Sequence, residues 1–206
     1  MVGITRPHDL LRLSSPLDVV PQDAPAWVGA ALRVAPWVVV RRATAPTGRL
    51  AVGVRGKARA HRFAMEIPAT AVTELLAPED LTSRNASIKR ALPAARALKA
   101  VSALLDETAM PWGPTGSVGF ELASGAPAVK AISDVDLLLR PVRLPTRGWL
   151  WCLYTAFGQL PARIDCQIET DAGAVALAEL VSGAREVLLR TQTGPRLIPA
   201  PWPAAA

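Results

Sequence analysis

The stretch that decides the fold reads GPTGSVGF at residues 113–120 and SDVDLLL at residues 133–139. The glycine-rich part predicts a turn that opens a short helix, and the second part predicts a strand. Alternate side chains of a strand share one face, so Asp134 and Asp136 should point the same way. We therefore expect two carboxylates to converge beside a turn that suits a phosphate.

The chemistry of this pair predicts a hard divalent cation. Two carboxylates repel each other unless a positive group lies between them, and Mg²⁺ prefers oxygen ligands while keeping waters for substrate phosphates. We expect Asp134 and Asp136 to bind Mg²⁺ as metal ligands and catalytic residues. Gly116 and Ser117 would supply N–H groups and a hydroxyl for phosphate oxygens. The alternatives are aspartates that only cap a strand and a Gly-Ser turn that is only a loop.

Positive charge is concentrated between residues 41 and 65, a segment without any Asp or Glu in a chain of net charge +6. Gly53 and Gly56 allow a close backbone approach to a phosphate beside Arg55. We expect Arg55 and Arg59 to bind substrate phosphates, with docking of an acidic partner or a solvated basic face as the alternatives. The cations of this segment are Arg41, Arg42, Arg49, Arg55, Lys57, Arg59 and Arg62.

Composition excludes several classes of protein. Hydrophobic residues make up 50% of the chain and charged residues 19%, which indicates a globular protein rather than a disordered one. With two cysteines and two histidines, a zinc site of His and Cys or a Ser/His/Asp triad is not expected. No apolar run is long enough to span a membrane and no export segment is visible, so we expect a cytoplasmic protein.

The chain is predicted to form two domains, residues 1–82 and residues 83–206. Strand-like runs at 37–42 and 50–54, joined by a turn, predict a basic β-hairpin in the first domain. The expected fold class is α+β: a nucleotidyltransferase-like mixed sheet backed by helices, with a small N-terminal α/β domain.

Other elements are expected from periodicity and turn residues. The first 30 residues should form an arm on the core, and a helix over 87–107 should be split at Pro93. The further expectations are a buried helix at 149–157, a strand at 163–169, a helix at 173–181 capped by Thr170 or Asp171, and an extended surface tail at 192–206.

The Gly-Ser turn, short helix and Asp-x-Asp strand resemble the signature of the nucleotidyltransferase superfamily. This resemblance implies a third carboxylate on a neighbouring strand, and Asp165 fits that pattern in the sequence RIDCQI. It would complete a second metal site or accept a proton, unless it only pairs with Arg163. Glu121 and Glu169 are weaker candidates. Cys166 and Cys152 are expected to be packing residues rather than nucleophiles.

A closer resemblance extends over nearly the whole chain. The segments RPHDLL (6–11), VVVRRA (38–43), VGVRG (52–56), PTGSVGFEL (114–122), SDVDL (133–137) and TGPRL (193–197) resemble the malonate decarboxylase holo-acyl-carrier-protein synthases. These enzymes are also called phosphoribosyl-dephospho-CoA transferases.

The resemblance implies a specific reaction. The prosthetic group would move from triphosphoribosyl-dephospho-CoA to a serine of the apo acyl carrier protein subunit of malonate decarboxylase, with release of diphosphate. The two catalytic aspartates of the family correspond to Asp134 and Asp136. Neither nucleic acid nor a membrane is expected as a partner.

Two rival functions follow from the same residues. One is a nucleotidyltransferase with another acceptor, such as the citrate lyase carrier protein, an RNA end or a small molecule. The other is a non-catalytic basic module that binds RNA or protein, which predicts no need for a divalent metal and a steep dependence on salt.

Overall fold

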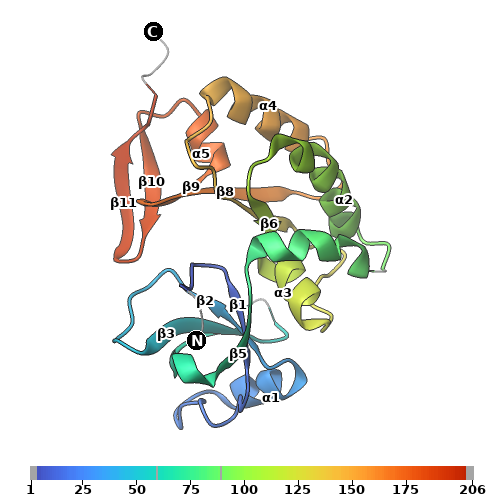
Figure 1. The fold of residues 1–206 in the computed structure, drawn as a ribbon. Helices are drawn as coiled ribbons and strands as arrows, with labels where there is room; N and C mark the ends of the chain where they lie inside the picture. Colours follow the sequence, from blue (N-terminus) through green and yellow to red (C-terminus); the bar gives the residue numbers. More distant parts are fainter. Residues whose placement is uncertain (1–3, 59, 89, 203–206) are drawn as a thin grey trace.

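The computed structural model describes residues 4–58, 60–88 and 90–202, and these residues form two β-sheets (Figure 1). The first sheet has the order β4-β3-β2-β1-β5 and the second β11-β10-β9-β8-β7-β6. A 3₁₀ segment, η2 (Pro78–Ser87), lies between them in the sequence. The α+β fold class expected from the sequence is confirmed.

The N-terminal sheet is antiparallel throughout and carries the predicted hairpin, since β2 pairs with β3 and β3 with β4. The residues 4–30 do not form the expected arm: β1 lies inside the sheet between β2 and β5, with Leu10 and Leu11 buried on its two faces. The elements are β1 (Leu10–Leu13), α1 (Ala26–Val34), β2 (Trp37–Val40), β3 (Arg49–Arg55), β4 (Arg62–Pro68), η1 (Ala69–Ala71) and β5 (Val72–Leu76).

Pro93 begins a helix rather than dividing one. Helix α2 (Pro93–Leu105) has Pro93 in its first turn, where a missing N–H costs nothing, and continues into η3 (Asp106–Thr108). Its apolar face, including Leu98 and Val101, is fully buried in the larger hydrophobic core.

The C-terminal sheet is mixed because β7 and β8 run parallel while its other pairs are antiparallel. Its strands are β6 (Trp112–Pro114), β7 (Val135–Leu139), β8 (Ile164–Thr170), β9 (Gly173–Ala176), β10 (Glu186–Thr191) and β11 (Gly194–Pro199). The strands expected around residues 134–140 and 163–169 are thus confirmed.

Three helices accompany this sheet: α3 (Gly116–Ser124), α4 (Arg147–Phe157) and α5 (Leu177–Val181). Helices α4 and α5 lie on the side of the sheet away from the N-terminal domain (Figure 1). Val135, Leu137 and Cys166 belong to the core that includes Leu150 of α4 and Leu177 of α5. The alternating residues of β7 and β8 therefore face the N-terminal domain.

Two expectations for the C-terminal half were wrong. The segment 173–181 is not one helix, since β9 precedes α5 and pairs with β8 and β10. Helix α4 is amphipathic: Leu150 and Phe157 are buried, whereas Trp151 is exposed. The tail expected to be extended on the surface contains β11, a largely exposed strand that also pairs with β10; residues 203–206 of that tail lie outside the described residues.

No helix within the described ranges is both long and apolar enough to cross a bilayer.

Candidate active site

Asp136 is the second residue of β7 and Asp134 immediately precedes the strand, and both line one hollow. Gly116 approaches Asp136 so closely that a β-carbon at position 116 would lie 1.7 Å from Asp136 Oδ2. Gly116 also has a φ of 57°, and the Thr115 N–H donates to the Asp136 carbonyl at 2.8 Å. The backbone of the glycine turn and the aspartate strand are therefore joined, and only glycine fits at the junction.

Asp165 is directly opposite Asp136 across the parallel β7–β8 pair. Neighbours at the same register of a parallel pair point to the same face, so Asp165 shares the face of Asp136. Asp165 does not line the hollow that Asp134 and Asp136 border, and among the described residues the three aspartates do not form a group that could hold a metal ion. The alternative pairing with Arg163 is not seen: within the described ranges, neither residue's side chain makes a hydrogen bond or ion pair. The Asp165 carboxylate is therefore available to accept a proton.

Helix α3 directs its N-terminus at this strand end. The first N–H groups of a helix have no partner within it, and the Thr115 side chain does not cap them. Ser117 is buried, yet it borders the same hollow as Asp134 and Asp136. The amides of the first turn and the Ser117 hydroxyl are thus placed to bind an anion beside the aspartates.

The β3–β4 end of the N-terminal sheet, rather than the turn of the predicted β2–β3 hairpin, borders this hollow, whose volume is about 330 Å³. Arg55, Lys57 and Arg62 line it together with Ser117 and the two aspartates, so the N-terminal domain completes the site. We call this hollow, lined by residues of both domains, the interdomain hollow. Its lining is Arg55, Lys57, Arg62, Ser117, Ala128, Lys130, Ile132, Ser133, Asp134 and Asp136.

The charge of Asp136 affects the pKa of Arg55. Burial and neighbouring Arg62 lower the pKa of Arg55, while the charge of Asp136 opposes that shift. The phosphate-binding role predicted for Arg55 thus falls on a residue at the site. Arg59, predicted for the same role, lies outside the described residues.

Stacked rings support the connection between β3 and β4. Trp27 of α1 stacks on His61 with ring centroids 4.8 Å apart. A β-carbon on Gly56 would lie 2.6 Å from the His61 β-carbon and 2.7 Å from the Trp27 ring. Close packing at Gly56 therefore holds the turn that separates Arg55 from Arg62.

Glu121, one of the weaker catalytic candidates, supports the loop before β7 instead. It accepts hydrogen bonds from the Ala128 and Val129 amides at 2.7 and 2.8 Å and from Arg90. Burial alone would raise the pKa of Glu121, but the hydrogen bonds from Arg90 and the two amides lower it. The Glu121 carboxylate therefore has a structural role.

The donor set fits the predicted Mg²⁺. Among the residues that the structure describes, no group of three or more His, Cys, Asp and Glu side chains could hold a metal ion. Asp134 and Asp136 form a two-carboxylate donor set, and Mg²⁺ commonly takes one or two carboxylates and leaves its other positions to water and phosphate. Metal binding by this pair stays a prediction that the oxygen chemistry supports.

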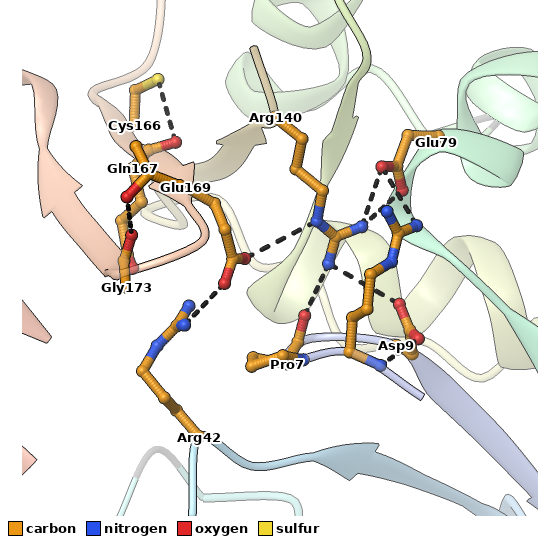
Figure 2. Close-up of polar contacts among 11 residues, drawn as sticks. Pro7, Asp9, Arg42, Glu79, Arg140, Cys166, Gln167, Glu169 and Gly173 are labelled. Carbon is orange, nitrogen blue, oxygen red and sulfur yellow. Dashed lines mark hydrogen bonds and ion pairs between the residues drawn. The ribbon is translucent and has the colours of Figure 1, made fainter. Parts of the chain in front are cut away.

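Glu169, the other weaker candidate, belongs to an ion network between the domains (Figure 2). It pairs with Arg42 of the N-terminal domain at 2.5 Å and with Arg140 at 3.6 Å. Arg140 donates two 2.8 Å hydrogen bonds to Glu79 and one to the Pro7 carbonyl. We call this set the interdomain network; its charged members are Arg6, Arg42, Arg140, Asp9, Glu79 and Glu169.

Three arginines balance three carboxylates in the interdomain network, and His8 lies among them. Burial lowers the pKa of His8 to about 4; Glu169 opposes that shift, and Arg42 and Arg140 reinforce it. Burial likewise raises the pKa of Asp9, against the influence of the Arg6 amide and Arg140. A proton on His8 would add an uncompensated charge to a balanced set.

We expect this histidine to make the protein acid-sensitive. Below pH 6.5 an unfolded chain protonates His8, whereas the folded protein resists until about pH 4. The free energy of unfolding should thus fall as the pH drops through that window, by up to about 3 kcal/mol for this group. His8→Asn should remove this component, because asparagine tolerates the positive φ of 74° at this position.

Urea denaturation of both proteins at several pH values in that window measures the effect. Equal losses of stability in the wild type and His8→Asn would exclude His8 as the source.

No pattern in the sequence predicts the roles of Arg140, Glu79 and His8 in the interdomain network. Of these, only His8 lies in a quoted segment, RPHD, which supported a resemblance and was given no structural role. Cys166 is buried and Cys152 exposed, and neither forms a disulfide. Burial and the charge of Asp165 raise the pKa of the Cys166 thiol, which agrees with a packing role.

Comparison with known proteins adds independent information. Residues 6–78 match the family model described as the phosphoribosyl-dephospho-CoA transferase MdcG N-terminal domain, and residues 80–201 match the model of its C-terminal domain. No solved structure matches the chain.

Curated relatives agree over nearly their full lengths. A phosphoribosyl-dephospho-CoA transferase of Pseudomonas aeruginosa is 46% identical over 95% of this chain and 93% of its own length. One from Pseudomonas putida is 44% identical over 96% and 95%, and one from Azotobacter vinelandii is 40% identical over 97% and 95%.

Proposed function

The chain belongs to the phosphoribosyl-dephospho-CoA transferase family, and from that membership we propose its donor and its acceptor. The donor is triphosphoribosyl-dephospho-CoA, and the acceptor is a serine of the apo acyl carrier protein subunit of malonate decarboxylase. Diphosphate is the second product. The protein is an enzyme, a transferase, and its two unpaired cysteines accord with a cytoplasmic location.

One observation carries this proposal: the interdomain hollow gathers opposite kinds of charge around a helix N-terminus. Asp134 and Asp136 line it from the beginning of β7, and Arg55 and Lys57 line it from the end of β3 and the residues after it. Cations and helix amides bind phosphate oxygens, while paired carboxylates bind the cation that accompanies a polyphosphate. A polyphosphate donor uses all of these groups at once.

The reaction is an in-line displacement at the α-phosphorus of the donor. The serine Oγ forms a bond to this phosphorus while the bond to the bridging oxygen of the β-phosphate breaks, and diphosphate leaves with that electron pair. When bound, Mg²⁺ held by Asp134 and Asp136 neutralises charge that develops on the phosphate oxygens.

The remaining roles belong to side chains and amides of the chain. The amides at the start of α3 and the Ser117 hydroxyl orient the phosphates, while Arg55 and Lys57 stabilise the charge of the leaving diphosphate. Asp165 accepts the serine proton, a role that fits a carboxylate without a salt-bridge partner among the described residues.

The test is to incubate the protein with the apo carrier protein, triphosphoribosyl-dephospho-CoA and Mg²⁺, and to weigh the carrier protein by mass spectrometry. We expect a mass gain equal to one phosphoribosyl-dephospho-CoA group. The gain should disappear with Asp134→Asn and with a chelator.

A folded, metal-supplied enzyme that produces no gain would refute this donor and acceptor pair. The apo carrier protein of citrate lyase and other acceptors would then be screened with the same donor.

A further inference from the structure

A second cavity, of about 620 Å³, opens beside the first strand residues of β8. The last turns of α4, the loop after it and the beginning of α5 form its walls. This volume lies within the range of cavities that hold nucleotide-sized ligands, roughly 300–1,000 Å³. None of the roles assigned above uses it, and we call it the α4 cavity.

The chemistry of the α4 cavity differs from that of the interdomain hollow. Phe157, Cys166 and Leu177 give it an apolar floor and are themselves buried. Trp151 and Tyr154 stand at its side with 54% and 43% of their surfaces exposed. Their ring centroids are 6.1 Å apart. Large exposed rings beside an apolar floor form a surface on which a flat heterocycle can stack.

Asp165 connects the α4 cavity to the catalytic strands. It borders the cavity, and it is directly opposite Asp136, which lines the interdomain hollow. A ligand that spans this strand end can thus place one part against the aromatic rings and another against the catalytic aspartates.

Arg163 gives the cavity a site for a phosphate. It is exposed at the cavity margin, and its guanidinium makes no hydrogen bond or ion pair with any described residue. A guanidinium in this position is suited to a phosphodiester or diphosphate because it can donate two parallel hydrogen bonds.

We propose that the α4 cavity binds the dephospho-CoA arm of the donor, with the purine against Trp151 and Tyr154 and the diphosphate of that arm near Arg163. This inference rests on the proposed function, which supplies a donor with two chemically distinct ends. The polyphosphate end matches the charged interdomain hollow, whereas a purine and a pantetheine chain match an apolar, aromatic cavity.

The test measures binding of 3′-dephospho-CoA alone, by calorimetry and without metal or acceptor. Ala178 is exposed and lines the cavity, so Ala178→Phe fills it from the surface. The matched control is Ala103→Phe, at an exposed position on α2. We expect Trp151→Ala to weaken binding roughly tenfold through loss of base stacking, Ala178→Phe to weaken it roughly as much by filling the cavity, and the control to bind like the wild type.

Steady-state kinetics with the full donor separate this inference from the proposed function. Ala178→Phe should raise KM for the donor with kcat nearly unchanged. Normal transfer with an unchanged donor KM, or a raised KM for the carrier protein alone, would overturn the cavity assignment and leave the proposed function standing. Dephospho-CoA binding that Ala178→Phe weakens, in a protein that transfers nothing to the carrier protein, would overturn the proposed reaction instead.

Discussion

Replacing Asp136 with asparagine should lower kcat for prosthetic-group transfer about a hundredfold to a thousandfold, which corresponds to roughly 3–4 kcal/mol of transition-state stabilisation. The substitution keeps the size of the side chain and removes its charge. The Asp136 carbonyl still accepts from the Thr115 amide, so the junction between β7 and the glycine turn should remain intact. The loss should therefore be one of chemistry rather than of folding.

Asp171→Asn provides the matched control, because Asp171 is exposed in the turn after β8. It should retain wild-type kcat, and all three proteins should have the same circular dichroism spectrum. Binding of Mn²⁺, followed by electron paramagnetic resonance, should weaken with Asp136→Asn alone. Wild-type turnover by Asp136→Asn would remove this residue from the catalytic site.

The largest effect on stability is expected from Arg140→Met. Arg140 is only 8% exposed and contacts Asp9, Glu79 and Glu169 as well as the Pro7 carbonyl. Methionine fills part of the space but leaves these carboxylates without their shared cation. Loss of one partner from a buried ion network costs about 3–5 kcal/mol, and we expect a decrease of that size in the free energy of unfolding.

Urea denaturation measures this decrease, with Arg143→Met as the control. Arg143 is exposed shortly after β7, so its substitution should change stability by no more than about 0.5 kcal/mol. If both variants lost the same small amount, the interdomain network would not hold the domains together.

Local patterns in the sequence were sufficient for the elements that carry the site. The alternation in SDVDLLL and the glycine turn before it predicted β7 and α3, because both depend on neighbouring residues alone. The sequence also identified Asp165 as a candidate because apolar residues flank it. The register of the parallel β7–β8 pair places Asp165 opposite Asp136.

The elements and contacts that the sequence did not predict depend on partners that are distant in the sequence. Strand β1 is central because β2 and β5 flank it, and β9 is a strand because β8 and β10 are available to pair with it. Arg42 and Arg55 belong to one basic segment, yet Arg42 binds Glu169, 127 residues away, while Arg55 faces the interdomain hollow. The density of positive charge in the sequence could not show that Arg42 forms an ion pair while Arg55 lines the hollow.

The interdomain network also bears on how this chain can change over evolutionary time. Its charges come from the residues before β1, the residues after β2, the connecting 3₁₀ segment, the residue after β7 and strand β8, so a cut near residue 79 would leave unbalanced ions on either fragment. Such halves cannot be exchanged freely with unrelated domains, since any new partner would have to supply the missing charges at matching positions. The two units are therefore expected to be inherited together and to accept substitutions at this boundary only in compensating pairs.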